Sequence, residues 1–178
     1  EVTRLLPELL NRERSALVLF TSWRQLNAVT KALPEHVADG LLVQGDGSKQ
    51  ALILEHRRRI DEGERSHLVG LASFSEGLDL PGDYCRHVVI VKLPFAVPDD
   101  PVDQAIAEWA EAQGRNPFYE ISVPDAALKL VQACGRLIRN ERDYGTVTML
   151  DKRIVTQRYG RALIDSLPPF RLDIAPLG

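Results

Sequence analysis

Cysteine is scarce in this sequence of 178 residues, which contains only Cys85 and Cys134. Both lie in apolar segments, and neither stands at a metal-ligand spacing from any of the four histidines. Two thiols in apolar surroundings are typical of buried, unpaired cysteines in a reducing compartment. The sequence therefore predicts neither a disulfide framework nor a metal site.

Long apolar runs and a strong net charge are also missing. No apolar run approaches the roughly 20 residues of a membrane-spanning helix, and no signal peptide is recognisable. We therefore expect a cytoplasmic protein without a membrane partner. The formal net charge is only -3, so any contact with nucleic acid has to come from a local patch or from backbone amides.

What the sequence does contain is a regular alternation of short apolar runs and amphipathic segments. Its apolar content of 44% and charged content of 26% are ordinary for one globular domain. The apolar runs are predicted to be strands at Ser15–Phe20, Leu41–Val43, His67–Leu71, Val88–Val91 and Thr146–Leu150. The segments between and around them are predicted to be helices at Val2–Arg12, Trp23–Leu33, Ser48–Asp61, Val102–Gln113, Asp125–Arg139 and Arg158–Leu167.

This alternation predicts an α/β fold in which helices cover both faces of a mostly parallel sheet. We expect one domain over residues 1–178, interrupted by an irregular and helical insertion at residues 94–124. The chain begins Glu1-Val2-Thr3-Arg4, without a methionine, which suggests a segment of a longer protein.

The segment from Asp125 to Arg139 divides into two faces when it is projected as a helix at about 100° per residue. Pro124 and Asp125 are expected to mark its start, with Asp125 as the N-cap. The polar face carries Gln132, Gly135, Arg136 and Arg139. The apolar face consists of Ala127, Leu130, Val131, Cys134, Leu137 and Ile138. Arginine offers a rigid fork of donors that matches phosphate oxygens, although a surface helix with two solvated arginines is the simpler alternative.

A second constellation, SFSEGLDLPGD, runs from Ser73 to Asp83 and directly follows a predicted strand. Ligand sites of open α/β sheets lie at the carboxyl ends of strands. The loop combines small residues, glycines and three carboxylates, so it suits contacts with a nucleotide and with nucleic-acid phosphates. A glycine-rich loop with solvated acids is the alternative.

Thr21 and Ser22 end the first predicted strand and begin a helix. Short hydroxyl side chains and free amides at a helix start suit a phosphate. Ser22 is also a good helix N-cap, and the two roles are compatible. The basic run from His56 to Arg59 lies near a helix C-terminus, where the helix dipole or solvent accounts for it better than nucleic acid does.

Gln132-x-x-Gly135-Arg136-x-x-Arg139 resembles motif VI of superfamily 2 helicases, a helix of their second RecA-like motor domain. The tail from Asp143 to Arg153 and the S-E-G-L-D-L-P-G-D loop are similar to those of the XPD/DinG branch, in which the loop is motif V. The Thr21-Ser22 pair stands where the family has motif IV. The resemblance implies a RecA-like three-layer sandwich of the P-loop NTPase type, and a bacterial protein of the DinG type.

The resemblance also implies roles for the residues of these motifs. Arg139 would be the arginine finger, Arg136 a second phosphate contact or a link to the motif V loop, and Gln132 a group near the γ-phosphate. The nucleotide-binding set would be Gly77, Asp79, Glu76 and Gly135. The DNA-binding set would be Thr21, Ser22, Ser73 and Ser75.

A phosphate loop of the pattern GxxxxGK[ST] and a DEAH-like acidic pair are absent from the sequence. By the resemblance, ATP with Mg²⁺ is held mainly by a preceding N-terminal motor domain, and this segment alone is inactive. An iron–sulfur cluster is possible in that first half. Cys85 and Cys134 do not match its ligand positions, so no cluster is expected in this segment.

We therefore predict the C-terminal motor half of an ATP-dependent helicase that translocates on single-stranded DNA, with 5′ to 3′ polarity favoured by the resemblance. One alternative is a non-catalytic RecA-like interaction module. Another is a relative that acts on RNA or carries a nuclease. A kinase of small substrates is disfavoured, because that class needs a phosphate loop.

Overall fold

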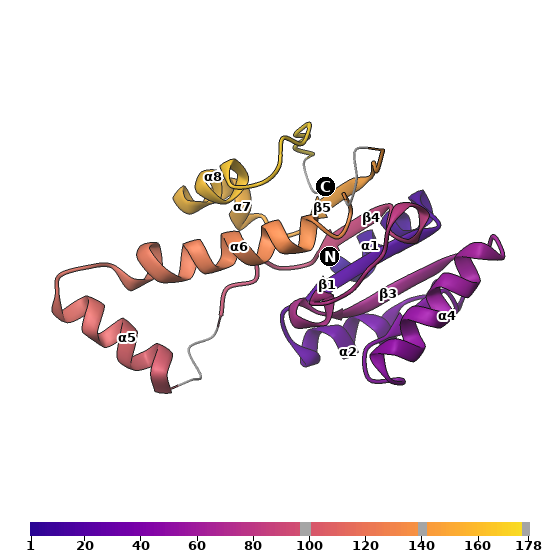
Figure 1. Cartoon of the computed structure of the whole chain (residues 1–178), viewed down its shortest axis with the longest axis horizontal. Coiled ribbons are helices and arrows are strands. Elements are labelled where there is room, and N and C mark those ends of the chain that lie inside the picture. The colour runs from indigo at the N-terminus through magenta and orange to yellow at the C-terminus, as the bar shows by residue number, and fades with distance from the viewer. Residues whose placement is uncertain (97–100, 139–141, 176–178) are drawn as a thin grey trace.

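Five parallel strands form the centre of the fold in the computed structural model, which describes residues 1–96, 101–138 and 142–175 (Figure 1). Their order across the sheet is β2-β3-β1-β4-β5. The strands are β1 (Ser15–Phe20), β2 (Leu41–Val43), β3 (Ser66–Leu71), β4 (His87–Ile90) and β5 (Thr146–Met149). Each lies within two residues of its predicted bounds, and the predicted parallel sheet is confirmed.

The central strand β1 is buried along its whole length, and its side chains contribute to two separate hydrophobic cores. Successive side chains of a strand point to opposite faces of the sheet. Leu17 and Leu19 accordingly join one core, while Val18 and Phe20 join the other. A strand with an apolar residue at nearly every position therefore needs helices on both faces.

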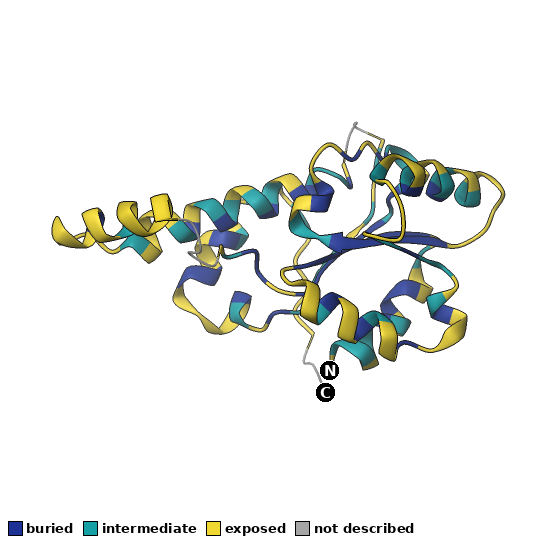
Figure 2. Cartoon of the chain, turned by 90° about the horizontal axis from the view of Figure 1, so that it is seen from below, coloured by how far each residue is buried: buried dark blue, intermediate teal, exposed yellow. Residues whose placement is uncertain are grey.

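Helices supply that cover on both faces of the sheet (Figure 2). Leucines of α1 and α2 pack in the core that contains Phe20, whereas apolar residues of α4, α6 and α8 pack in the core that contains Leu17. The α-helices are α1 (Val2–Arg12), α2 (Trp23–Ala32), α3 (Glu35–Ala38), α4 (Lys49–Asp61), α5 (Pro101–Ala112), α6 (Val123–Cys134), α7 (Arg153–Thr156) and α8 (Arg158–Asp165). The shorter helical turns are η1 (Ala72–Ser75), η2 (Gly82–Tyr84) and the π-helical η3 (Phe118–Ser122).

Helix α5 and the first part of α6 extend away from the sheet (Figure 1). Ala110 is buried, but Val102, Ile106 and Trp109 are exposed by 63%, 45% and 58%. The sequence predicts an amphipathic helix here, but its large apolar side chains are exposed to solvent in the described structure. We continue to propose that residues 94–124 are an insertion, of which 97–100 lie outside the described residues.

The prediction of the central helix was wrong at both ends. Helix α6 begins at Val123, directly after η3, and Ser122 occupies the cap position. Asp125 lies inside the first turn and pairs with Lys129, with 2.8 Å between Oδ2 and Nζ. At the other end, α6 stops at Cys134 and the chain continues in tight turns as far as Leu137.

Of the six residues predicted for the apolar face of this segment, three are buried, two are half-buried and one is exposed. Leu130, Cys134 and Leu137 are fully buried, and Ile138 is 40% exposed because it lies beyond the end of the helix. After the end of the helix the backbone forms turns with hydrogen bonds between residues three apart. The Arg136 amide donates to the Ala133 carbonyl, and the Leu137 amide donates to the Cys134 carbonyl. Arg136 therefore leaves α6 in a turn rather than on a helical face.

Gly145 allows two segments to meet at the base of β5. A Cβ at this position would collide with the carbonyl oxygen of Arg86 and with the side chain of Leu137. The guanidinium of Arg86 lies 4.0 Å from the ring centroid of Tyr144 and donates to the Tyr144 carbonyl at 3.0 Å. A glycine is therefore required for β5 to start beside β4.

Candidate nucleotide and nucleic-acid interface

The predicted contact segments follow the carboxyl ends of neighbouring parallel strands. Thr21 follows β1, Gln44 follows β2, and η1 follows β3. Because β2, β3 and β1 are adjacent in the sheet, these segments lie along one edge of it. The fold thus brings motif IV and motif V of the resemblance to the same side of the molecule.

Thr21 and Ser22 are both exposed at this edge. The Ser22 Oγ accepts a hydrogen bond of 3.3 Å from the Gln25 amide, so Ser22 caps α2 as predicted. The remaining amides of the first turn of α2 lie beside it, where an anion is favoured. A contact between this helix start and nucleic acid stays a prediction.

The two serines of the motif V loop are placed differently. Ser73 is exposed. Ser75 is only 5% exposed, and its Oγ donates to the Ala72 carbonyl at 2.7 Å. The structure does not present the Ser75 hydroxyl to a phosphate, because the turn η1 turns it inward. We correct the predicted DNA-binding set accordingly and retain Ser73.

Glu76, Gly77 and Asp79 form the exposed part of the loop. Gly77 has a φ of +70°, in the left-handed region that favours glycine. No atom of the described chain lies within 4 Å of a Cβ built at this position. The backbone of the loop is therefore open to an approaching ligand, as a nucleotide contact requires.

Two basic side chains of α4 hold this loop: the sequence alone did not single out Lys49, and it assigned Arg57, as part of the basic run, to the helix dipole or solvent. The Nζ of Lys49 donates to the Glu76 carbonyl and lies 5.4 Å from the centroid of the Phe74 ring. The Nη2 of Arg57 donates to the Asp79 carbonyl at 2.6 Å and lies 3.7 Å from its carboxylate. A spacing of eight residues puts both on one side of a helix, which is the signal that could have found them.

The other arginines of the basic run are used within α4 and next to it. Arg58 pairs with Glu55 and Glu62, and Arg59 pairs with Glu55 and donates to the Asp39 carbonyl. Hydrogen bonds from Arg58 and then Arg59 lower the pKa of Glu55 to about 2. Arg58 and Arg59 therefore stabilise this end of α4, and the preference for a role of the run other than nucleic-acid binding stays a prediction.

Arg136 connects the end of α6 to the motif V loop. Its Nη1 donates to the Leu78 carbonyl at 2.9 Å. Of the two roles left open by the sequence, the structure shows the link to the loop, and contact with a phosphate remains a prediction. Gln132 is exposed on the last turn of α6, and Gly135 follows as the C-cap residue. Arg139 lies outside the described residues.

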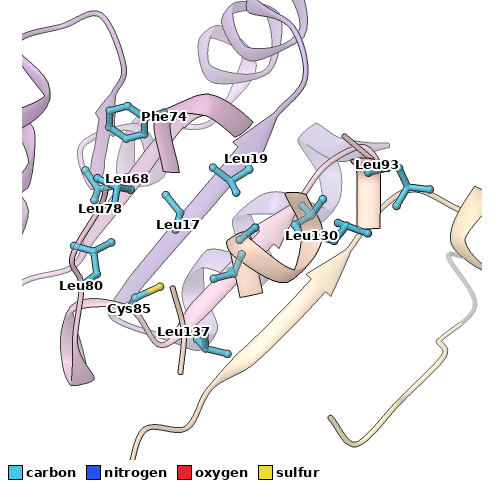
Figure 3. Packing of buried hydrophobic residues seen from close by; sticks show 14 of the residues in the cluster. Leu17, Leu19, Leu68, Phe74, Leu78, Leu80, Cys85, Leu93, Leu130 and Leu137 are labelled. Atoms are coloured by element: carbon cyan, nitrogen blue, oxygen red, sulfur yellow. The ribbon is translucent and has the colours of Figure 1, made fainter. Parts of the chain in front are cut away.

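Apolar side chains anchor the same loop from beneath. Leu78 and Leu80 are buried in the core that also contains Leu130 and Leu137 from the α6 segment (Figure 3). Burying a leucine side chain contributes roughly 1.5–3 kcal/mol. The loop from Glu76 to Asp79 is therefore exposed to solvent on one side and anchored in the hydrophobic core on the other.

A buried carboxylate, Asp151, connects the ends of β4 and β5. It accepts from the Leu93 amide at 3.0 Å and pairs with Arg153 at 2.6 Å. Burial alone would raise the pKa of this carboxyl, but hydrogen bonds from Arg153 and the Leu93 amide outweigh it and lower the pKa. Asp151 and Arg153, which end the segment similar to the XPD/DinG branch, thus have a structural role: they hold together the segments that follow β4 and β5.

The described residues contain no group of three or more histidine, cysteine or acidic side chains that could hold a metal ion. Within the same residues, no helix is both long enough and apolar enough to cross a membrane.

The five-stranded parallel sheet with helices on both faces is an α/β fold of the RecA-like type. A family model described as "Helicase C-terminal domain" matches residues 6–170, and the chain therefore belongs to this family. Two solved structures share the fold. The structure named "XPD_APO" has a TM-score of 0.72 and 21% identity over 92% of this chain and 33% of its own. The structure of S. tokodaii Xpd4 has a TM-score of 0.67 and 19% identity over 94% of this chain and 32% of its own.

Curated relatives carry the name "ATP-dependent DNA helicase DinG". The protein of Photobacterium profundum is 49% identical over 171 residues, which cover 94% of this chain and 25% of the relative. The protein of Escherichia coli K12 is 44% identical over 160 residues, which cover 88% of this chain and 22% of the relative. The chain thus spans about a quarter of the length of the relatives it matches.

Proposed function

We propose that this chain is the C-terminal motor half of an ATP-dependent DNA helicase. The observation that carries the proposal is the hydrogen bond from Arg136 to Leu78, which joins the QxxGRxxR segment to an open, glycine-containing loop at the strand ends. The names of the relatives support the same activity. Because the chain spans only part of those relatives, the activity belongs to a longer protein.

The chemistry proposed for this half is stabilisation of charge on ATP as its γ-phosphoryl group is transferred to water. Negative charge spreads over the phosphoryl oxygens, and a guanidinium from across a cleft stabilises it. Arg139 is the proposed finger, with Arg136 beside it. Gln132, exposed on the last turn of α6, would hydrogen-bond near the attacking water.

The nucleotide contacts proposed for the loop are its backbone and side chains at Glu76, Gly77 and Asp79. Lys49 and Arg57 fix the carbonyls of Glu76 and Asp79, so the amides between them keep one orientation. Fixed donors cost no reorganisation when charge develops. Gly135, the C-cap residue of α6, directly precedes Arg136 and completes the proposed nucleotide-binding set.

The proposed DNA track consists of the exposed hydroxyls of Thr21, Ser22 and Ser73. These contacts suit backbone phosphates, which position a strand without reading its sequence. Because the track and Arg136 sit on one rigid domain, a change in its distance from the N-terminal motor domain would move the bound strand. The proposed result of this coupling is translocation on single-stranded DNA, with the 5′ to 3′ polarity that the family resemblance favours.

The partner that completes the site is proposed to be an N-terminal motor domain of the same protein, which would hold ATP and Mg²⁺. Any iron–sulfur cluster would also lie there. A cluster of this kind takes four cysteine thiolates, and this chain has two cysteines, both buried.

ATP hydrolysis by the full-length protein tests the proposal, measured without polymer and with single-stranded DNA or RNA of the same length. We expect stimulation by DNA above that by RNA, and displacement of a streptavidin block from one end only. The absence of ATP hydrolysis would favour a non-catalytic role, and equal turnover with and without polymer would favour an unrelated ATP-hydrolysing role. Stronger stimulation by RNA would assign the motor to that polymer.

A further inference from the structure

An open depression of about 410 Å³ lies beside the proposed DNA track. It is formed by segments that follow β1, β2 and β3. Its lining consists of Trp23, Gln44, Gly45, Gly47, Lys49, Ser73 and Phe74. Of the residues that line this depression, only Ser73 belongs to the proposed DNA track.

Trp23 is the dominant side chain of the depression. It is the first residue of α2, directly after Thr21 and Ser22, and is 44% exposed. A Cβ built on Gly45 would lie 3.8 Å from the indole ring, so the ring rests against the turn that follows β2. An aromatic ring supported on one side and open to solvent is a suitable platform for stacking.

Three polar side chains, Gln44, Lys49 and Ser73, share the lining with the apolar Phe74. The Gln44 Oε1 accepts from the Leu71 amide at 2.8 Å, which holds this side chain in place. Lys49 contributes a positive charge at the rim and is held by the Glu76 carbonyl. Ser73, which also lines the depression, is exposed. A flat π surface surrounded by an amide, an ammonium and a hydroxyl matches a base attached to its phosphates.

The second tryptophan of the chain provides a contrast. Trp109 lies on α5 in a depression lined by Pro101, Val102, Ala105 and Ile106, all of them apolar. The residues that line that depression carry no polar side chain other than the indole, and the Arg115 guanidinium lies 6.0 Å from the centroid of the Trp109 ring. The two exposed tryptophans therefore differ in surroundings, and only the site of Trp23 adjoins the predicted phosphate contacts.

We propose that Trp23 stacks on one base of the bound single strand while the adjacent phosphates lie across Thr21, Ser22 and Ser73. The proposal rests on the proposed function and adds a base contact to a track that was otherwise limited to phosphates. Stacking on an aromatic ring tolerates any base, so it would strengthen binding without imposing a sequence. It would also give the strand a discrete position of one nucleotide on this domain.

The test compares two probes on the full-length protein: oligothymidylate and an abasic deoxyribose-phosphate oligomer of the same length. Loss of one base–aromatic stack corresponds to a decrease in affinity of about 5- to 150-fold. We expect Trp23→Ala to weaken oligothymidylate binding by a factor in this range and to leave binding of the abasic oligomer unchanged. Trp23→Phe should restore most of the affinity for oligothymidylate.

Trp109→Ala is the matched control, because it removes an exposed tryptophan from the apolar surface. We expect it to bind both probes as the wild type does. An equal loss for both probes in Trp23→Ala, or no loss for either, would overturn the proposal. Failure of the proposed function is a separate result, since a wild-type protein without DNA-stimulated ATP hydrolysis would reveal it before any variant is made.

Discussion

Arg136 is a half-buried guanidinium that joins two parts of the chain 58 residues apart through its bond to Leu78. A hydrogen bond that involves a charged group contributes about 1.5–3 kcal/mol, more than an exposed ion pair. The same bond fixes the loop whose amides are proposed to meet the nucleotide. A single residue thus stabilises the domain and positions the site.

The first prediction concerns this bond. Arg136→Ala should lower the free energy of unfolding by about 1.5–3 kcal/mol, because the Leu78 carbonyl loses a charged donor. Denaturant titration of the purified chain measures the change. Arg58→Ala is the control, since its ion pairs on α4 are exposed and should contribute at most about 1 kcal/mol. Equal losses in the two variants would contradict the assigned role.

Lys49 and Arg57 show what sequence reasoning misses at the scale of residues. The glycine-rich loop and the motif VI arginines are recognisable because their types and spacing are unusual. A lysine and an arginine on a helix are not unusual, and only the fold reveals that they reach the carbonyls of Glu76 and Asp79. The inward rotation of Ser75 has the same origin, since it depends on the turn η1.

At the scale of elements, the strands could be predicted well and the ends of α6 could not. Buried parallel strands have short, continuous apolar runs that turn residues bound clearly. Pro124 was taken to mark a boundary, but a proline fits within the first turn of a helix, where its missing N–H has no partner to lose. At the other end, the helix stops at Gly135 and Arg136 turns toward Leu78, a tertiary contact that leaves no local signal.

Asp151, like Arg136, joins two separate parts of the chain: it connects the segments that follow β4 and β5. Asp151→Asn should lower the free energy of unfolding by roughly 1–3 kcal/mol, since the charged acceptor of the Leu93 amide and of Arg153 is lost. Thermal or denaturant unfolding of the chain measures this loss.

Asp165→Asn is the matched control for Asp151→Asn. It removes an exposed carboxylate that pairs with Arg161 one helical turn away on α8, and it should change stability by less than about 1 kcal/mol. An equal loss of unfolding free energy in the two variants would contradict the proposed structural role of Asp151.

At the scale of the whole molecule, three histidines buried in or beside the sheet make the fold sensitive to acid. His56 donates to the Tyr84 carbonyl at 2.7 Å and bonds the Ser66 hydroxyl at 2.8 Å, an arrangement that suits a neutral ring. Burial lowers the pKa of His56 and of His87. Burial, followed by repulsion from His56, Arg65 and His87, lowers the pKa of His67 to about 3.

A lowered pKa in the folded state means that the unfolded chain binds more protons below pH 6.5. Stability is then lost as pH falls from about 6.5 toward the folded pKa. Between pH 7.5 and pH 5.5 we expect the free energy of unfolding to fall by about 1 kcal/mol or more from His67 alone. Denaturant titrations at the two pH values measure the difference.

Two variants separate this cause from a general effect of pH. His67→Leu should reduce the loss between pH 7.5 and pH 5.5, whereas replacing the exposed His36 with glutamine should leave it unchanged. A stability that does not depend on pH in this window would show that the buried histidines are not held neutral by the fold.

At this scale we propose that the domain presents one half of a nucleotide site. The open loop, the last turn of α6 and the start of α2 lie on one rigid body, while no phosphate loop is present in the sequence. Such a body is suited to complete a nucleotide site held elsewhere and to carry a strand with it as the two parts close and open. The central claim is therefore that this half contributes charge stabilisation to hydrolysis rather than affinity for the nucleotide.

The most direct test of that claim measures nucleotide binding and ATP hydrolysis separately in the full-length protein with Arg139→Ala. We predict that hydrolysis stimulated by single-stranded DNA falls by a factor of about 10³–10⁵ while ATP binding is largely retained. Hydrolysis at the wild-type rate in this variant would contradict the account.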